Sequence, residues 1–99
     1  MTIKELQDWV RQDWEKYHDT MPSVKLQLLY VIEELGEVAE AIRKADNEKK
    51  DRDEKVHKDS KIGPEMGDLL VSLVTLANSF GVDLTREVKG FQARLEERR

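Results

Sequence analysis

Residues 24–45 read as one long helix with two different faces. On an α-helix each residue turns by about 100°, so four glutamates of this stretch fall within an arc of roughly 120°. They are Glu33, Glu34, Glu37 and Glu40. Apolar side chains occupy the opposite side of the helix, namely Leu28, Val31, Leu35, Val38 and Ile42. A chain with this stretch has to bury one side of a long helix and leave the other side acidic.

The acidic face of this helix lacks counter-charges. No lysine or arginine occurs from residue 26 to residue 41. Glu33 and Glu37 are four residues apart, a spacing at which like charges on a helix repel each other. Only Glu40 has basic neighbours, at positions 43 and 44. Acidic helix faces are commonly just solvated, but the missing counter-charges favour a site for a cation.

A second pair of carboxylates, Glu65 and Asp68, lies at the start of another helical pattern. No further charged residue follows until Asp83. A helical hairpin would bring this pair face to face with the glutamates of the long helix. Carboxylate oxygens without nitrogen or sulfur ligands suit a hard divalent cation, above all Mg²⁺, with Mn²⁺ as the alternative.

The composition limits what the chain can be. A length of 99 residues predicts a single domain over residues 1–99. Hydrophobic and charged residues each make up 38% of the chain, so the core should be thin and completed by homo-oligomerisation. A net charge of −4 disfavours binding to a nucleic-acid polymer. Without a signal segment or an apolar run of membrane length, we expect no membrane partner and a cytoplasmic location.

The first half of the chain predicts two helices. Thr2 and Glu5 have the spacing of a capping box, and the first helix should run from Ile3 to His18. Its predicted inner face consists of Ile3, Leu6, Val10, Trp14, Tyr17 and Met21. Pro22 ends this pattern. Ser23 is a candidate N-cap for the second helix, which should end near Ala45.

The second half of the chain predicts a loop and two more helices. Residues 46–62 are highly charged and should form a mobile loop. The third helix should span residues 64–80, stop at Gly81, and bury Met66, Leu69, Leu73, Leu76, Ala77 and Phe80. Asp83 can cap a fourth helix that runs to the C-terminus. With no strand-like alternation, the fold class should be all-α, a four-helix bundle completed by homo-oligomerisation.

Two motifs in order resemble a known family. Glu33-Glu34-x-x-Glu37, followed after a charged loop by Glu65-x-x-Asp68, is similar to the signature of the MazG-like all-α nucleoside triphosphate pyrophosphohydrolases. The resemblance extends over most of residues 24–95. In addition, the segment from Asp13 to His18 resembles the first helix of the dCTP pyrophosphatase branch.

This resemblance implies an all-α bundle that pairs as a homodimer or homotetramer. It also implies Mg²⁺-dependent hydrolysis of a nucleoside triphosphate, expected to be a deoxynucleotide or a modified nucleotide, to the monophosphate and pyrophosphate. The implied metal ligands are Glu34, Glu37, Glu65 and Asp68. We expect a carboxylate of the group Glu33, Glu34 and Glu37 to position or deprotonate the attacking water.

The same resemblance suggests substrate-binding residues. Trp14 matches an aromatic residue that contacts the nucleobase, although a tryptophan in that position of a helix is more often part of the core. Lys89 and Arg94 resemble basic positions that face the phosphates. Where the dCTP branch has further aromatic pocket residues, this chain has Lys44 and Ser72, so the base preference stays open.

Two other classes of protein deserve comparison. A ferritin-like di-iron bundle uses a Glu-x-x-His on each of two helices. Both Glu15-x-x-His18 and Glu54-x-x-His57 occur here, but the second lies in the charged segment with no apolar face beside it. The stronger alternative is a non-catalytic helical interaction module whose acidic, metal-binding face contacts a basic partner.

Overall fold

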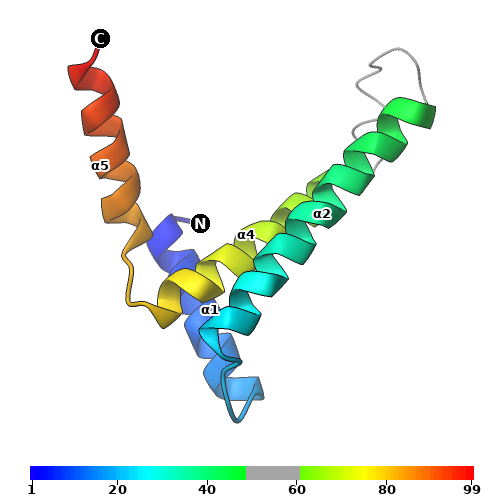
Figure 1. Ribbon diagram of the computed structural model, residues 1–99. Helices are drawn as coiled ribbons and strands as arrows, with labels where there is room; N and C mark the ends of the chain where they lie inside the picture. Colours follow the sequence, from blue (N-terminus) through cyan, green and yellow to red (C-terminus); the bar gives the residue numbers. More distant parts are fainter. Residues whose placement is uncertain (49–60) are drawn as a thin grey trace. The chain divides into compact units, whose positions relative to one another are not determined.

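A computed structural model describes residues 1–48 and 61–99, and these residues form four α-helices and no strand (Figure 1). The helices are α1 (Ile3–Tyr17), α2 (Val24–Glu48), α4 (Ile62–Ser79) and α5 (Leu84–Glu97). The prediction of an all-α fold is therefore confirmed.

The chain divides into two compact units. The first unit combines Met1–Pro22 with Val74–Arg99, and so contains α1, the end of α4, and α5. The second unit is Ser23–Leu73, which contains α2 and the first part of α4. Within the second unit, α2 and this part of α4 lie side by side (Figure 1).

Three helices begin at the caps that the sequence predicts. The Thr2 hydroxyl accepts a hydrogen bond from the Glu5 N–H at 3.1 Å, and a Glu5 carboxylate oxygen accepts one from the Thr2 N–H at 3.0 Å. The Ser23 hydroxyl accepts from the Leu26 N–H at 3.2 Å. The Asp83 carboxylate accepts from the Arg86 N–H at 3.2 Å. Each cap satisfies a main-chain donor that has no partner inside its helix.

The end of α4 also follows the prediction. Gly81 adopts a φ of 66°, a left-handed conformation that favours glycine. The Val82 N–H donates to the Ala77 carbonyl at 3.0 Å, and the Gly81 N–H donates to the Asn78 carbonyl at 3.1 Å. This pair of bonds is a Schellman motif, which satisfies the last carbonyls of the helix and turns the chain toward α5.

The predicted loop over residues 46–62 is wrong at its edges. Helix α2 continues three residues beyond Ala45, because neither glycine nor proline interrupts the chain there and charged residues are compatible with an exposed helix. Helix α4 begins at Ile62, because Pro64 falls within the first turn, where its missing N–H has no intrahelical partner to lose. The remainder of the predicted loop, residues 49–60, lies outside the described residues.

The core of the described residues consists of small side chains. In the first unit the buried apolar residues are Val10, Val74 and Ala77. In the second unit they are Val38, Ala41 and Ala45. No leucine, phenylalanine or tryptophan among the described residues reaches this degree of burial. The expectation of a thin core therefore holds for the single chain.

Several side chains predicted to be buried are exposed instead. Met66, Leu73 and Phe80 of α4 are 50%, 44% and 65% exposed. The prediction was wrong because α4 is apolar on nearly every side, so its periodicity does not select the inward face. The predicted inner faces of the first two helices are also incomplete. Their exposed members are Ile3, Tyr17, Met21, Leu28, Leu35 and Ile42. On α5, Val88 and Phe91 are exposed.

Candidate functional site

Three carboxylates meet in the second unit. Glu34 comes from α2, while Glu65 and Asp68 come from adjacent turns of α4. One oxygen atom of each lies within 4.8 Å of an oxygen of the other two. Glu34 and Glu65 are half-buried and Asp68 is exposed. The hairpin of α2 and α4 thus brings together the two acidic patterns of the sequence, as predicted.

The electrostatics of this cluster are unfavourable without a cation. Burial, followed by the nearby charges of Asp68 and Glu65 and then of Glu37 and Glu33, raises the pKa of Glu34 above its ordinary value of 4.5. Within residues 1–48 and 61–99, no lysine or arginine forms an ion pair with a member of the cluster. Bringing a divalent cation to these oxygens would remove the repulsion.

Glu40 shows what a basic neighbour does on the same helix. Its carboxylate accepts hydrogen bonds from the Arg43 guanidinium, with a distance of 3.1 Å for the Nε donor. These hydrogen bonds lower the pKa of Glu40. The predicted pairing of Glu40 with its basic neighbour is confirmed. In this respect Glu40 differs from the cluster of Glu34, Glu65 and Asp68, which has no basic partner among the described residues.

Of the four predicted metal ligands, the structure brings three together. Glu37 is exposed and is not one of the residues whose oxygens converge, although its charge acts on Glu34. Glu33 is exposed beside the cluster. The donor set of Glu34, Glu65 and Asp68 consists of oxygen alone, so it fits a hard divalent cation such as Mg²⁺ or Mn²⁺ better than a thiophilic metal.

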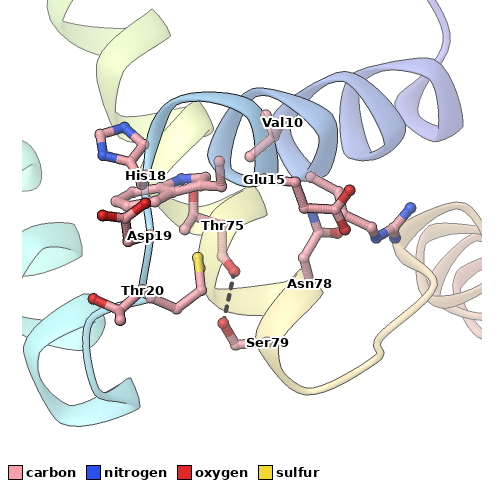
Figure 2. A pocket seen from close by; sticks show the side chains of 11 residues that line it. Val10, Glu15, His18, Asp19, Thr20, Thr75, Asn78 and Ser79 are labelled. Carbon is pink, nitrogen blue, oxygen red and sulfur yellow. Dashed lines mark hydrogen bonds between the residues drawn. The ribbon is translucent and has the colours of Figure 1, made fainter.

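A pocket of about 430 Å³ lies in the first unit (Figure 2). Its walls come from α1 and the segment after it on one side, and from the last turns of α4 on the other. The residues that line it are Val10, Arg11, Trp14, Glu15, His18, Asp19, Thr20, Met21, Thr75, Asn78 and Ser79. Its volume is in the range of pockets that hold small molecules, roughly 300–1,000 Å³.

Trp14 is part of an aromatic pair in this pocket. The ring centroids of Trp14 and His18 are 4.2 Å apart, with an angle of 39° between their planes. Such a surface can stack on a flat ligand. The structure therefore places Trp14, predicted as a base contact, at a pocket with an aromatic wall.

The charges around the pocket are mostly negative. The Arg11 guanidinium binds the Asp8 carboxylate at 3.1 Å, so its charge is compensated. Glu15 and Asp19 form no hydrogen bond or ion pair through their carboxylates within the described part of the chain. The pocket suits the uncharged, flat part of a ligand better than a phosphate group.

Lys89 and Arg94 do not line this pocket. Both lie exposed on α5, and the Arg94 guanidinium is close to Gly90, where an added Cβ would lie 3.3 Å from Nη1. Their predicted contact with phosphates stays a prediction. Glu54 and His57, the second half of the di-iron pattern, lie outside the described residues.

Gln7 and Asn78 were not predicted from the sequence. They are 71 positions apart in the chain, and their side chains are hydrogen-bonded to each other. Gln7 is buried although it is polar, and it lies seven residues before Trp14 on the same face of α1. A glutamine on an otherwise apolar face was the available signal. Its partner could not be read from the sequence, because nothing local links the two positions.

Comparison with known proteins identifies the family of this chain. Residues 22–99 match the MazG nucleotide pyrophosphohydrolase domain, so the chain belongs to this family. The family supports nucleotide pyrophosphohydrolase activity in general. The match begins after α1, and so it includes none of the residues that α1 contributes to the pocket, Trp14 among them.

One curated relative is the uncharacterized protein YvdC of Bacillus subtilis (strain 168). It is 28% identical over 102 residues, which cover 99% of this chain and 96% of that protein. No solved structure matches significantly.

In the described residues no single helix is both long and apolar enough to cross a membrane. Only α4 and α5 taken together, as a bent pair, satisfy those two criteria.

Proposed function

We propose that the protein hydrolyses a nucleoside triphosphate, a deoxynucleotide or a modified nucleotide, to the monophosphate and pyrophosphate with Mg²⁺ or Mn²⁺ as cofactor. The observation that carries this proposal is the convergence of Glu34, Glu65 and Asp68 in a chain of the MazG family. An acidic cluster alone is common on protein surfaces. Together with the family match and the raised pKa of Glu34, it supports a metal site.

In this proposal the carboxylates have two roles. Glu34, Glu65 and Asp68 would hold the cation, and Glu37 is the fourth proposed ligand. When bound there, a divalent cation would lower the pKa of a water ligand and shield charge on the phosphates. A carboxylate of the group Glu33, Glu34 and Glu37 accepts the proton of the attacking water or orients that water.

The remaining contacts to the substrate are proposed from the resemblance and the pocket. Trp14 stacks on the nucleobase, which is supported by its position at an aromatic pocket of suitable size. Lys89 and Arg94 contact phosphates. A cytoplasmic location, and the lack of a nucleic-acid polymer or membrane as partner, also stay proposals.

We further propose that the active form is a homodimer or homotetramer. In residues 1–48 and 61–99, large apolar side chains are exposed on α2, α4 and α5, and the buried apolar side chains are valine and alanine. Many exposed large apolar side chains are typical of a chain with an interaction surface. A second copy of the chain would supply the missing core.

The test is pyrophosphate release from a panel of canonical and modified nucleoside triphosphates with Mg²⁺. We expect release by the wild type, a loss of at least about 100-fold in the Asp68→Asn variant, and no release in EDTA. Glu40→Gln is the matched control, because it removes a carboxylate of the same helical hairpin that pairs with Arg43 instead. It should retain wild-type turnover.

Two results would contradict the proposal. Unchanged turnover of a folded Asp68→Asn variant would remove the metal assignment. No release from any nucleotide, with Mg²⁺ still raising the melting temperature of the wild type, would favour a non-catalytic interaction module with an acidic, metal-binding face.

A further inference from the structure

The side chain of Gln7 joins α1 to the segment between α4 and α5. Its Nε2 donates to the Val82 carbonyl at 2.8 Å and to the Asn78 Oδ1 at 2.9 Å. Its Oε1 accepts from the Leu84 N–H, in the first turn of α5, at 3.0 Å. Gln7 is only 5% exposed, so water does not compete effectively for these bonds.

Main-chain groups determine the orientation of the Gln7 amide. The Val82 carbonyl can only accept a hydrogen bond, and the Leu84 N–H can only donate one. The nitrogen of Gln7 therefore has to face Val82, and its oxygen has to face Leu84. Neither main-chain group can exchange its role, so the side-chain amide has one allowed orientation.

Gln7 in turn determines the orientation of Asn78. The Asn78 Nδ2 donates to the main-chain carbonyl of Gln7 at 3.0 Å, while the Asn78 Oδ1 accepts from the Gln7 Nε2 at 2.9 Å. Rotation of the Asn78 amide by 180° would place two donors together and two acceptors together. The flipped state is therefore strongly disfavoured, unlike that of an asparagine in solvent.

Asn78 also lines the pocket that contains Trp14 (Figure 2). An asparagine amide has two N–H donors and two acceptor lone pairs. Its two bonds with Gln7 use one donor and one acceptor, so one N–H and one lone pair of this amide are not used by Gln7. Because the flipped state is disfavoured, the nitrogen and the oxygen of the Asn78 amide keep the same positions.

We infer that Asn78 reads the hydrogen-bonding edge of a nucleobase stacked on Trp14, and that Gln7 is the positioning residue that holds Asn78 in one orientation. This inference rests on the proposed function, since that proposal places a base at Trp14. An amino group and an oxo group at the same position of a base require opposite orders of donor and acceptor. The Gln7 and Asn78 pair thus selects between 4-amino and 4-oxo pyrimidines, or between 6-amino and 6-oxo purines.

The inference is tested by binding, without catalysis. Trp9 does not line the pocket, so a Trp9→Phe background leaves Trp14 as the single fluorescent tryptophan. In EDTA, this protein is titrated with dCMP, dUMP, dAMP and dIMP, and quenching of Trp14 gives each dissociation constant. We expect the two members of at least one amino and oxo pair to differ by about tenfold or more.

Four substitutions connect the selectivity to the proposed residues. The Asn78→Leu variant should retain quenching. The ratio of the dissociation constants of the amino and oxo nucleotides should fall to about one, because this variant lacks both hydrogen-bonding groups. Gln7→Met should lower the ratio through Asn78 without touching the ligand. Gln12→Met is the matched control on α1, since Gln12 is exposed and does not line the pocket. Asn78→Asp preserves the acceptor for Gln7 and loses the donor, and it provides the test if the leucine variant does not fold.

Each result decides the inference. The inference is supported if the nucleotides quench Trp14 and the ratio of the amino and oxo dissociation constants falls in the Asn78 and Gln7 variants but not in Gln12→Met. Absence of quenching by all four nucleotides, equal affinities in the wild type, or an unchanged ratio in a folded Asn78 variant would overturn it. Selective binding without Mg²⁺-dependent hydrolysis would leave the reading of the base intact and remove the proposed reaction instead.

Discussion

The pKa values of two glutamates of α2 are shifted in opposite directions because their surroundings differ. Glu34 lies beside the carboxylates of Glu65 and Asp68, and its pKa is raised by burial and by these charges. Glu40 accepts hydrogen bonds from Arg43, and its pKa is lowered. Both residues are part of the same acidic helix face, but only Glu34 lies where negative charge is uncompensated.

The raised pKa of Glu34 predicts a pH-dependent stability. In the folded state Glu34 binds its proton more tightly than in the unfolded state, where its pKa has the ordinary value of 4.5. The resulting stabilisation is complete below pH 4.5 and is lost as the pH rises through the raised pKa of the folded state. In EDTA, the melting temperature of the wild type relative to Glu34→Gln should therefore fall between acid and neutral pH.

Mg²⁺ provides the second part of this experiment. At neutral pH it should raise the melting temperature of the wild type more than that of Glu34→Gln, because a cation that binds the folded state stabilises it by mass action. Sodium chloride at matched ionic strength is the control for general screening. Parallel melting curves for the two proteins at every pH would contradict the assignment of Glu34.

The three members of the carboxylate cluster could be predicted from the sequence, but the complete site could not. Glu65 and Asp68 are one helical turn apart, and Glu34 belongs to an unpaired acidic face, so their residue types and local spacing indicated a cation site. The roles of Glu37, Lys89 and Arg94 depend on a bound substrate and stay predictions. Gln7 and Asn78 could not be paired from the sequence, because their contact depends on how α1 packs against the end of α4.

At the scale of the helices, local signals determined the ends well. Thr2, Ser23 and Asp83 act as caps where their side chains can accept from the N–H three residues later. Gly81 ends α4 through its positive φ. The boundaries that were missed, at the end of α2 and the start of α4, lie where no residue forces the helix to stop.

Alanine substitutions at two glycines should change the stability of the protein in opposite directions. At Gly81 an added Cβ meets nothing within 4 Å, but φ is 66°, so the Gly81→Ala variant should lose about 1 kcal/mol of stability through backbone strain. At Gly36, inside α2, an added Cβ also meets nothing within 4 Å, so Gly36→Ala should gain about 1 kcal/mol through helix propensity.

Urea denaturation followed by circular dichroism measures both glycine variants. Gly81→Asn serves as the control for strain, because asparagine tolerates the left-handed conformation better than alanine and should lose less stability. A Gly81→Ala variant as stable as the wild type would contradict the described turn. Destabilisation by Gly36→Ala would indicate that this position is covered in the assembled protein.

At the scale of the whole molecule, many large apolar side chains of the described residues are exposed. Leu28, Ile32 and Leu35 form a stripe along α2 on the side opposite its glutamates, and they are 49%, 55% and 55% exposed. Exposed leucine and isoleucine at this spacing are typical of a helix that packs against another helix. The proposed second copy of the chain would cover this stripe.

The stripe predicts the effect of a charge on self-association. Ile32→Lys should raise the dissociation constant of the oligomer by at least about tenfold, because it removes an apolar contact and places a charge in the interface. Light scattering after gel filtration, at several protein concentrations, measures the mass. Lys44→Glu, an exposed position of the same helix outside the stripe, should leave the mass unchanged.

A monomeric wild type at all concentrations would contradict the proposed oligomer. An oligomer of unchanged mass in Ile32→Lys would move the interface to another exposed face, such as that of α5 with Val88 and Phe91. If a sample is monomeric, its activity shows whether a single chain is active.

The sequence by itself determined the helices, their caps and the residue types of the carboxylate cluster. These features depend on interactions within one or two helical turns, so local spacing is sufficient to read them. Only the tertiary structure decided that Glu34 meets Glu65 and Asp68, that Val74 rather than Leu73 is buried, and that Gln7 orients Asn78. These outcomes depend on how helices pack, and a helix that is apolar on nearly every side does not encode its inward face in its periodicity.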